Sequence, residues 1–277
     1  MSRLSSTPPP IVLTIAGFDP SSGAGVTADI KTIAAHGCYG VACITALTVQ
    51  STQGVREVVA VEAGLVAKTL EDLADDMAIS AVHIGMLGSG DVTQAVAGFL
   101  RGRELRHVVL DPVLRASSSA ALLDEVGKAL MLKELVEIAD VLTPNVDEAA
   151  ALTGLPVTNI KEMKAAASRL HELGARAVVV TGGHLAEPTD LLCIKTTAGI
   201  RTNEFEGTKL HSASTHGTGC AFSTSIACHL AQGSDLPEAV KLAKEYVFQA
   251  ITGAYPVGRG TGPVNHFASY DLGKFRK

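Results

Sequence analysis

The stretch IVLTIAGFDPSSGAGVTADIKTIAA, residues 11–35, decides the fold class of this chain. Its first six residues form an apolar, β-branched run that is typical of a buried strand. A turn rich in Gly, Ser and Pro follows, and residues 28–35 have the spacing of a helix. Buried strands and helices alternate in this way along most of the chain, which is typical of parallel strands covered on both faces. The sequence therefore predicts an α/β protein.

Predicted strands and helices follow one another without a break from residue 11 onward. We expect strands at 11–16, 41–49, 55–61, 81–84, 107–110, 140–142 and 177–180. We expect helices at 28–35, 63–77, 91–100, 120–130, 146–152 and 160–173. An antiparallel pair at 191–195 and 199–205 comes next, and helices at 221–231 and 237–255 close the fold. Because no linker divides the chain, we expect a disordered lead-in at 1–10 and a single domain at 11–277.

The composition excludes several classes of protein. The 277 residues include 23 Lys and Arg against 28 Asp and Glu, a net charge of −5, and 47% are hydrophobic. Such a chain is neither disordered nor marked by the positive charge of a nucleic-acid binder. Its apolar runs are far shorter than the ~20 residues of a membrane helix, and its N-terminus has no apolar signal region. With five cysteines and no C-x-x-C pair, we expect a cytoplasmic protein with reduced thiols.

The strongest local motif is Thr215-His216-Gly217-Thr218-Gly219-Cys220, directly before a predicted helix. A glycine loop that opens a helix leaves backbone N–H groups free at the positive end of the helix dipole. This arrangement suits a phosphate or the charge that develops in phosphoryl transfer, although a plain helix start has the same pattern. Cys220 falls in the first helical turn, where we expect the dipole to lower the thiol pKa and make it a better base. Taken alone, a cysteine in this position also fits a packing role.

Glycines and polar residues follow the other predicted strands as well. The turn AGFDPSSGAG at 16–25 lacks the spacing of a dinucleotide fingerprint and the Lys of a phosphate loop. In TPNVDEAA, at 143–150, Asn145 and Glu148 form a capping box, but they would also suit hydrated Mg²⁺ beside a polyphosphate. Six residues come after strand ends: Gly17, Gln50, Met86, Asp111, Asn145 and Gly182. Parallel strands end at one sheet edge, so we expect a small-molecule site with separate lobes for substrate and phosphate donor.

Seven ordered segments between residues 16 and 220 resemble the hydroxymethylpyrimidine/phosphomethylpyrimidine kinases of thiamine biosynthesis, in the ribokinase-like superfamily. The segments are AGFDPSSGAGVTADIKT, ITALTVQST, IGMLGS, LDPV, LTPNVDEA, TGGH and STHGTGC. The resemblance implies a three-layer α/β/α fold with a central, mostly parallel sheet. It also implies phosphorylation of 4-amino-5-hydroxymethyl-2-methylpyrimidine, and then of its monophosphate, with ATP and Mg²⁺.

The resemblance further implies roles for individual residues. For the substrate they are Gln50 on the pyrimidine edge, Asp29 and Gly17 at the hydroxymethyl end, and Met86 and Val113 on the ring. The anion hole is formed by Gly217, Thr218, Gly219 and Cys220, with Cys220 as the base. The donor nucleotide is held by Asn145, Glu148, Thr181, Gly183 and Thr215, and Mg²⁺ by Glu148 and, through water, by Asp111.

Two positions depart from the family's pattern. Thr181 stands where the family commonly has Lys, and the stretch after Asp111-Pro112-Val113 reads Leu114-Arg115-Ala116-Ser117-Ser118-Ser119 where Lys-Ser-Gly is common. We expect Arg115 or a mobile Lys to supply the missing positive charge, unless Mg²⁺ alone suffices. Two other functions stay open: a pyridoxal or pyridoxine kinase, and a non-catalytic pyrimidine-binding protein. The antiparallel pair at 191–205 and the exposed strand at 55–61 are candidate contacts of a homodimer.

Overall fold

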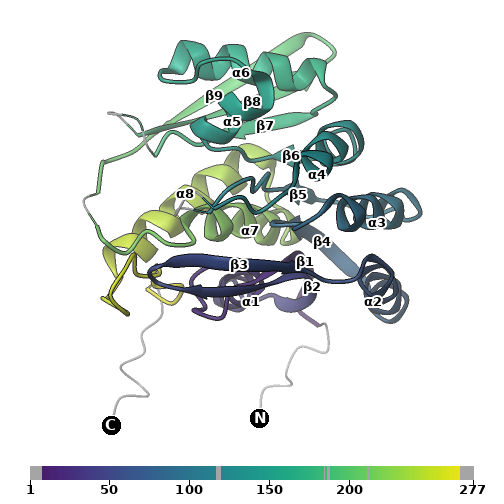
Figure 1. Cartoon of the computed structure of the whole chain (residues 1–277). Helices are drawn as coiled ribbons and strands as arrows, with labels where there is room; N and C mark the ends of the chain where they lie inside the picture. The colour runs from purple at the N-terminus through teal and green to yellow at the C-terminus, as the bar shows by residue number, and fades with distance from the viewer. Residues whose placement is uncertain (1–7, 117–119, 184, 186–187, 211, 269–277) are drawn as a thin grey trace, which may run out of the picture.

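The computed structural model describes residues 8–116, 120–183, 185, 188–210 and 212–268. Helices cover both faces of one large sheet (Figure 1). Its strands are β1 (Ile11–Phe18), β2 (Tyr39–Ser51), β3 (Gly54–Ala60), β4 (Ile79–Ile84), β5 (Val108–Leu110), β6 (Val141–Leu142), β7 (Ala177–Val180), β8 (Thr189–Thr196) and β9 (Gly199–Glu206). Their order in the sheet is β3-β2-β1-β4-β5-β6-β7-β8-β9.

The sheet is parallel from β2 to β7 and antiparallel at both edges. β1 pairs in parallel with β2 and β4, and the parallel pairing continues through β5 and β6 to β7. β3 runs antiparallel to β2, and β8 and β9 form an antiparallel pair next to β7. The predicted central, mostly parallel sheet and the predicted antiparallel pair near residue 200 are therefore confirmed.

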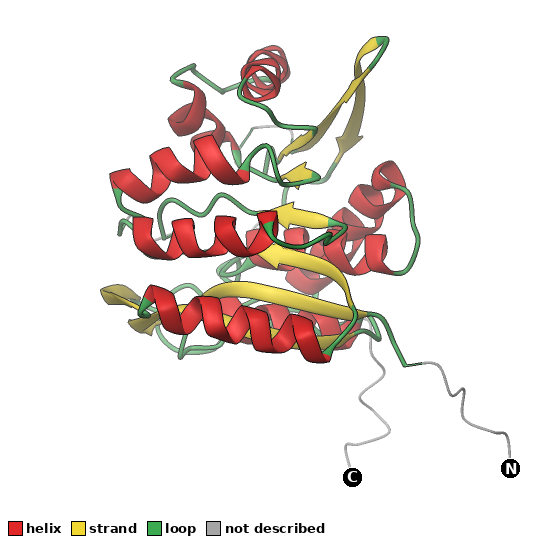
Figure 2. Cartoon of the chain, turned by 90° about the vertical axis from the view of Figure 1, so that its right-hand side faces the viewer, coloured by secondary structure: helices red, strands yellow, loops and turns green. Residues whose placement is uncertain are grey.

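Two helical layers sandwich the sheet, as Figures 1 and 2 show from two directions. One layer contains α2 (Ala63–Asp76), α3 (Gly90–Arg101), α4 (Glu125–Leu130), α5 (Val146–Thr153) and α6 (Ile160–Glu172), and the other α1 (Gly25–Ala35), α7 (Thr218–Ala231) and α8 (Leu236–Thr252). Successive strand residues point to opposite layers. On β1, Leu13 and Ile15 pack into the first core, whereas Val12 packs into the second. The predicted three-layer α/β/α architecture is therefore confirmed.

The boundaries of some helices differ from the prediction. The helix expected at 120–130 begins only at Glu125, because Asp124 caps it by accepting a hydrogen bond from Gly127 N at 2.6 Å. It then continues through a π-helical turn, Met131–Leu135. The final helix ends at Thr252 and not at residue 255. Of the predicted lead-in at 1–10, residues 1–7 lie outside the described residues.

The C-terminal segment after α8 returns to the carboxyl edge of the sheet. Thr261 N donates to Thr52 O at 2.9 Å, at the tip of the β2–β3 hairpin, and His216 N donates to Gly262 O at 3.0 Å. The segment therefore connects the hairpin to the loop in front of α7. Within the described ranges, no helix is both long enough and apolar enough to cross a membrane.

Candidate active site

Two glycine loops interlock at the carboxyl edge of the sheet. Gly217 has a φ of +82°, and a Cβ atom added there would lie 1.8 Å from the carbonyl oxygen of Gly23. Gly25 has a φ of +59°, and a Cβ atom there would lie 2.1 Å from the carbonyl oxygen of Gly17. Both positions need glycine for conformation and for space. The loop between β1 and α1 therefore lies in direct backbone contact with the loop in front of α7.

Asp19 holds the first loop and joins it to the second. Its carboxylate accepts hydrogen bonds from the backbone N–H groups of Ser21 at 2.8 Å, Gly23 at 3.1 Å and Ala24 at 2.9 Å. His216 Nε2 lies 2.8 Å from the same carboxylate. Burial would raise the pKa of Asp19, but the bonds from His216 and Ser21 outweigh it and lower the pKa. The sequence alone assigned no role to Asp19 or His216, although both lie inside the family motifs AGFDPSSGAGVTADIKT and STHGTGC.

Gln50 lies at the end of β2, next to His216. Its Nε2 atom is 3.2 Å from His216 Nε2, and Thr48 donates to its Oε1 at 3.1 Å. Because His216 Nε2 must carry a proton to bond the Asp19 carboxylate, it cannot also accept one from the Gln50 amide. The amide N–H of Gln50 is therefore available for a ligand.

An apolar wall stands beside this polar edge. Met86 and Val113 pack in one cluster with Ala46 and Leu122. A Cβ atom added to Gly17 would lie 2.7 Å from Met86 Sδ, so the glycine backbone lies against the methionine side chain. The structure thus brings together Gly17, Met86 and Val113, as the substrate prediction requires.

Cys220 lies in the first turn of α7 and next to the N-terminus of α1. α7 begins at Thr218, earlier than predicted, and its N-cap residue Gly217 provides no side-chain cap. The backbone N–H of Gly25, the first residue of α1, also interacts with the Cys220 sulfur. The predicted anion hole at 217–220 therefore lies where the positive ends of two helix dipoles meet.

The predicted lowering of the Cys220 pKa is wrong. Burial and the negative charges of Asp29, Asp111 and Glu148 raise the pKa of this thiol well above its usual value, and the N–H of Gly25 opposes them only in part. Desolvation outweighs the helix dipole here. At neutral pH, Cys220 is accordingly a thiol and not a thiolate.

The buried Asp111 and the partly buried Glu148 bring two carboxyl groups together beside the anion hole. Burial raises the pKa of Asp111 to about 6, and burial together with the charge of Asp111 raises the pKa of Glu148 to about 8. Asp111 lies against the glycine loop, since a Cβ atom on Gly219 would be 3.8 Å from its Oδ2. Near neutral pH Asp111 is therefore mostly ionised and Glu148 mostly protonated, and a bound cation would favour the ionised form of both.

This pair fits Mg²⁺. Among the described residues, no three His, Cys, Asp or Glu side chains form a cluster that could hold a metal ion by themselves. Mg²⁺ typically needs only one or two carboxylates, because water and substrate phosphates complete its shell. Asp111 and Glu148 meet that requirement at the place where the helix dipoles would hold the phosphates.

The residues predicted to hold the donor nucleotide also lie at this edge. Asn145 and Glu148 form the predicted capping box of α5, and Thr181 pairs with Asn145 in an isolated parallel bridge. Lys209 Nζ donates to the carbonyl oxygens of Gly183 at 2.9 Å and Leu185 at 3.0 Å, so this amine contacts the turn that follows Thr181. Thr215 is exposed in the loop before α7.

Arg115, the other candidate to replace the positive charge of the family's lysine, is exposed and forms an isolated β-bridge with Ala121. His184 lies outside the described residues.

Asp29 is the one predicted substrate residue that the structure does not place in the site. It is 0% exposed, and its oxygens accept hydrogen bonds from Thr14 at 2.6 Å and Thr224 at 3.0 Å. A carboxylate so enclosed cannot contact a substrate directly. The prediction was wrong because Asp29 lies one turn inside α1, on the face that packs against α7.

The chain is similar to known kinases along nearly its whole length. The phosphomethylpyrimidine kinase family model matches residues 19–265. The chain is 42% identical over 257 residues to the thiamine biosynthesis bifunctional protein ThiED of Geobacter sulfurreducens, an alignment that covers 92% of this chain and 52% of ThiED. It thus spans about half the length of that relative. It is 38% identical over 259 residues to the hydroxymethylpyrimidine/phosphomethylpyrimidine kinase of Haemophilus influenzae, with 93% of this chain and 96% of that protein covered.

A solved structure shows the same architecture. The pyridoxal kinase from Staphylococcus aureus in complex with AMP-PCP and pyridoxal superposes with a TM-score of 0.84 at 30% sequence identity, covering 95% of each chain. The family match extends from the first glycine loop to the segment that follows α8. The chain therefore belongs to the phosphomethylpyrimidine kinase family, whose members are phosphotransferases with a ribokinase-like fold.

Proposed function

We propose that this chain phosphorylates 4-amino-5-hydroxymethyl-2-methylpyrimidine, and then its monophosphate, with ATP as the donor. One observation carries the proposal: Gln50 and the apolar wall of Gly17, Met86 and Val113 lie at the same sheet edge as the open N-terminus of α7. Gln50 Nε2 lies 3.2 Å from His216 Nε2 in the loop before α7, so the two halves of the site are adjacent. The names of the relatives, which include hydroxymethylpyrimidine/phosphomethylpyrimidine kinase, support the same substrate.

Different residues of the site would bind different parts of the substrate. The available amide of Gln50 would pair with the amino group and ring nitrogen of the pyrimidine, which offer a matching donor and acceptor. Met86 and Val113 would pack on the ring, and the backbone of Gly17 would approach the hydroxymethyl group. This would direct the hydroxyl toward the first turn of α7.

The chemistry then depends on position and charge. Phosphoryl transfer has a loose transition state, so catalysis comes mainly from alignment and charge stabilisation and less from a strong base. The backbone N–H groups of Thr218, Gly219 and Cys220 would stabilise the transferring group. Mg²⁺ held through water by Asp111 and Glu148 would neutralise the donor phosphates.

Cys220 would accept the hydroxyl proton late in the transfer as a thiolate, so its own proton must first pass to solvent. Its raised pKa leaves little thiolate at neutral pH, and three carboxyl groups contribute to that shift. Binding of a cation at Asp111 and Glu148 would cancel two of these charges and lower the thiol pKa. We therefore expect Cys220 to be a thiolate, able to accept the hydroxyl proton, only when the site is loaded.

The test is an assay of ADP release with Mg²⁺ and ATP. The hydroxymethylpyrimidine, its monophosphate and pyridoxal would be offered in parallel, each with and without EDTA. Turnover of both pyrimidines, abolished by EDTA, is the expected result. No turnover of any substrate would contradict the proposal and favour a pyrimidine-binding protein without catalysis.

A pyridoxal kinase is the second candidate function. It is favoured by the likeness to the Staphylococcus aureus pyridoxal kinase, whose substrate also carries a hydroxymethyl group on a nitrogen heteroaromatic ring. In the assay above, turnover of pyridoxal alone would decide for it.

We also propose that the chain forms a homodimer through the β2–β3 hairpin. Leu47 is 50% exposed, Val49 52% and Val59 52%, and Leu47 pairs across the strands with Val59. An exposed apolar patch on an edge hairpin commonly marks an interface. Light scattering would show a dimer that Leu47→Glu dissociates and that Leu65→Glu, at a 56% exposed position on α2, leaves intact.

A cytoplasmic location is part of the same proposal. All five cysteines are free thiols, as expected in a reducing compartment. Fluorescence microscopy of the tagged chain, or fractionation of cells, tests it directly.

A further inference from the structure

A hub of buried polar side chains lies under the first turns of α7. Five side chains, each with an exposed fraction of 0%, form this hub: Thr14, Asp29, His83, Ser223 and Thr224. They come from four elements, β1, α1, β4 and α7. Burying so many polar groups is costly unless each has a partner. Nothing in the proposed function uses His83, Ser223 or Thr224.

One half of the hub is an ion pair. His83 Nδ1 lies 3.3 Å from Asp29 Oδ2, and the Asp29 carboxylate also accepts hydrogen bonds from Thr14 and Thr224. Thr14 is on β1 and Thr224 on α7, so Asp29 links its own helix α1 to both. The Thr14 hydroxyl donates to Asp29, and its oxygen lies 3.4 Å from His83 Nδ1, so a proton on His83 Nδ1 faces both the Asp29 carboxylate and Thr14 Oγ1.

The other half reaches the anion hole. His83 Nε2 lies 2.9 Å from Ser223 Oγ. The Ser223 hydroxyl has acceptors at 2.9 Å, the carbonyl oxygen of Gly219, and at 3.2 Å, Asp111 Oδ2. Ser223 is thus the only described side chain of the hub that contacts both the glycine loop and the acid pair.

The charge of His83 determines the direction of these bonds. Burial alone would lower the pKa of His83, but Asp29 and Asp111 outweigh it and raise the pKa. An imidazolium donates at both nitrogens, to Asp29 and to Ser223. Because Ser223 Oγ then accepts from His83, its single proton is free to point at Gly219 O or Asp111.

We propose that His83 is a positioning residue for phosphoryl transfer, which clamps the first turn of α7 through Ser223 and anchors that clamp on Asp29. The inference rests on the proposed function of the site. The clamp holds the turn whose N–H groups would face the transferring group, and a turn displaced by about 1 Å can cost ~10² in rate. Its loss should therefore lower kcat and leave substrate binding nearly unchanged.

The experiment compares His83→Gln, Ser223→Ala, the double variant and Thr14→Val with the wild type. We expect each of the first two to lower kcat about 10- to 100-fold, per folded molecule, with both KM values within about threefold. Since the two residues act as one unit, the double variant should be no slower than the slower single variant. Thr14→Val removes a bond to the same carboxylate from β1, so it should lower Tm and keep kcat.

A second readout does not need the pyrimidine. ADP with Mg²⁺ and aluminium fluoride mimics the transferring phosphoryl group, whereas ADP alone does not. We expect His83→Gln and Ser223→Ala to weaken the aluminium fluoride complex at least about tenfold and to bind ADP within about threefold of wild type. Ser223→Ala deletes one atom and serves if His83→Gln does not fold.

Three results would overturn the clamp. The first is a Ser223→Ala variant with the kcat and the aluminium fluoride binding of the wild type. The second is a double variant whose loss of kcat is the product of the two single losses. The third is a Thr14→Val variant that loses as much kcat as His83→Gln or Ser223→Ala. A wild type without pyrimidine turnover would contradict the proposed function instead. The aluminium fluoride comparison would then still decide about His83.

Discussion

Gly217→Ala is the sharpest test of the interlocked glycine loops. The added Cβ would lie 1.8 Å from the carbonyl oxygen of Gly23, whereas real Cβ atoms essentially never come closer than 3.0 Å. The two loops would thus have to separate by about 1.2 Å, the difference between these distances. A misplacement of ~1 Å in an aligned site costs ~10² in rate. The left-handed φ of +82° adds about 1–2 kcal/mol of strain in alanine.

Gly154→Ala is the matched control. Gly154 has a similar φ of +72° at the end of α5, but no atom lies within 4 Å of its added Cβ. This variant therefore carries the backbone strain without the collision. We expect both variants to lose about 1–2 kcal/mol of unfolding free energy. Only Gly217→Ala should also lose about 10²-fold or more in kcat.

The assay is steady-state ADP release, with the folded fraction of each variant taken from chemical denaturation. A kcat of Gly217→Ala within threefold of wild type would refute the reasoning, because it would mean that the loops can separate without moving the anion hole. An equal kcat loss in Gly154→Ala would refute it too, since strain alone would then explain the effect.

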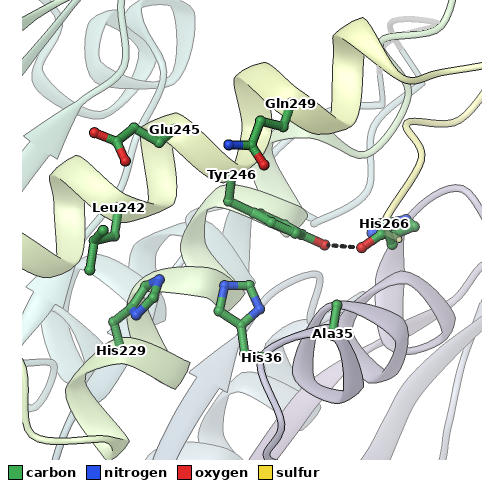
Figure 3. A pocket seen from close by; sticks show the side chains of 8 residues that line it. All are labelled: Ala35, His36, His229, Leu242, Glu245, Tyr246, Gln249 and His266. Carbon is green, nitrogen blue, oxygen red and sulfur yellow. Dashed lines mark hydrogen bonds between the residues drawn. The ribbon is translucent and has the colours of Figure 1, made fainter. Parts of the chain in front are cut away.

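Four further measurements follow from the site and its surroundings. Cys220→Ala should lower kcat about 10²- to 10⁴-fold, and a loss of less than tenfold would remove its role as proton acceptor. With pKa values of about 6 and about 8, Asp111 and Glu148 ionise as the pH rises. The apparent affinity for Mg²⁺ in the presence of ATP should therefore increase from pH 6 to 8.5. An affinity for Mg²⁺ that does not change over this range would contradict the metal assignment. Burial and the neighbouring His36 lower the pKa of His229 to about 4 in the hollow of Figure 3, so the unfolded chain takes up this proton first and the stability of the fold decreases as the pH falls from 6.5 to 4. His229→Gln should show a smaller loss over this range in urea titrations. Lys209→Ala should raise the KM for ATP a few-fold at constant kcat, and an unchanged KM would separate this lysine from the donor site.

Much of the fold followed from local pattern. The alternation of apolar strands and helices predicted the sheet, and the polar residues after each strand predicted which edge carries the site. Gln50, Met86, Asp111 and Asn145 do lie at that edge, because parallel strands must end on the same side. The resemblance of seven short motifs, in order, supplied the family.

The sequence by itself determined the elements, the motif order and the sheet edge, since these depend on residues close together in the chain. Only the tertiary structure decided the charge state of Cys220, the burial of Asp29 and the contact of Gly217 with Gly23. Each of these depends on segments that lie far apart in the chain, whose packing removes water and brings charges together. Desolvation is a property of that packing, so no local pattern could show that the Cys220 pKa rises where the helix dipole alone would lower it.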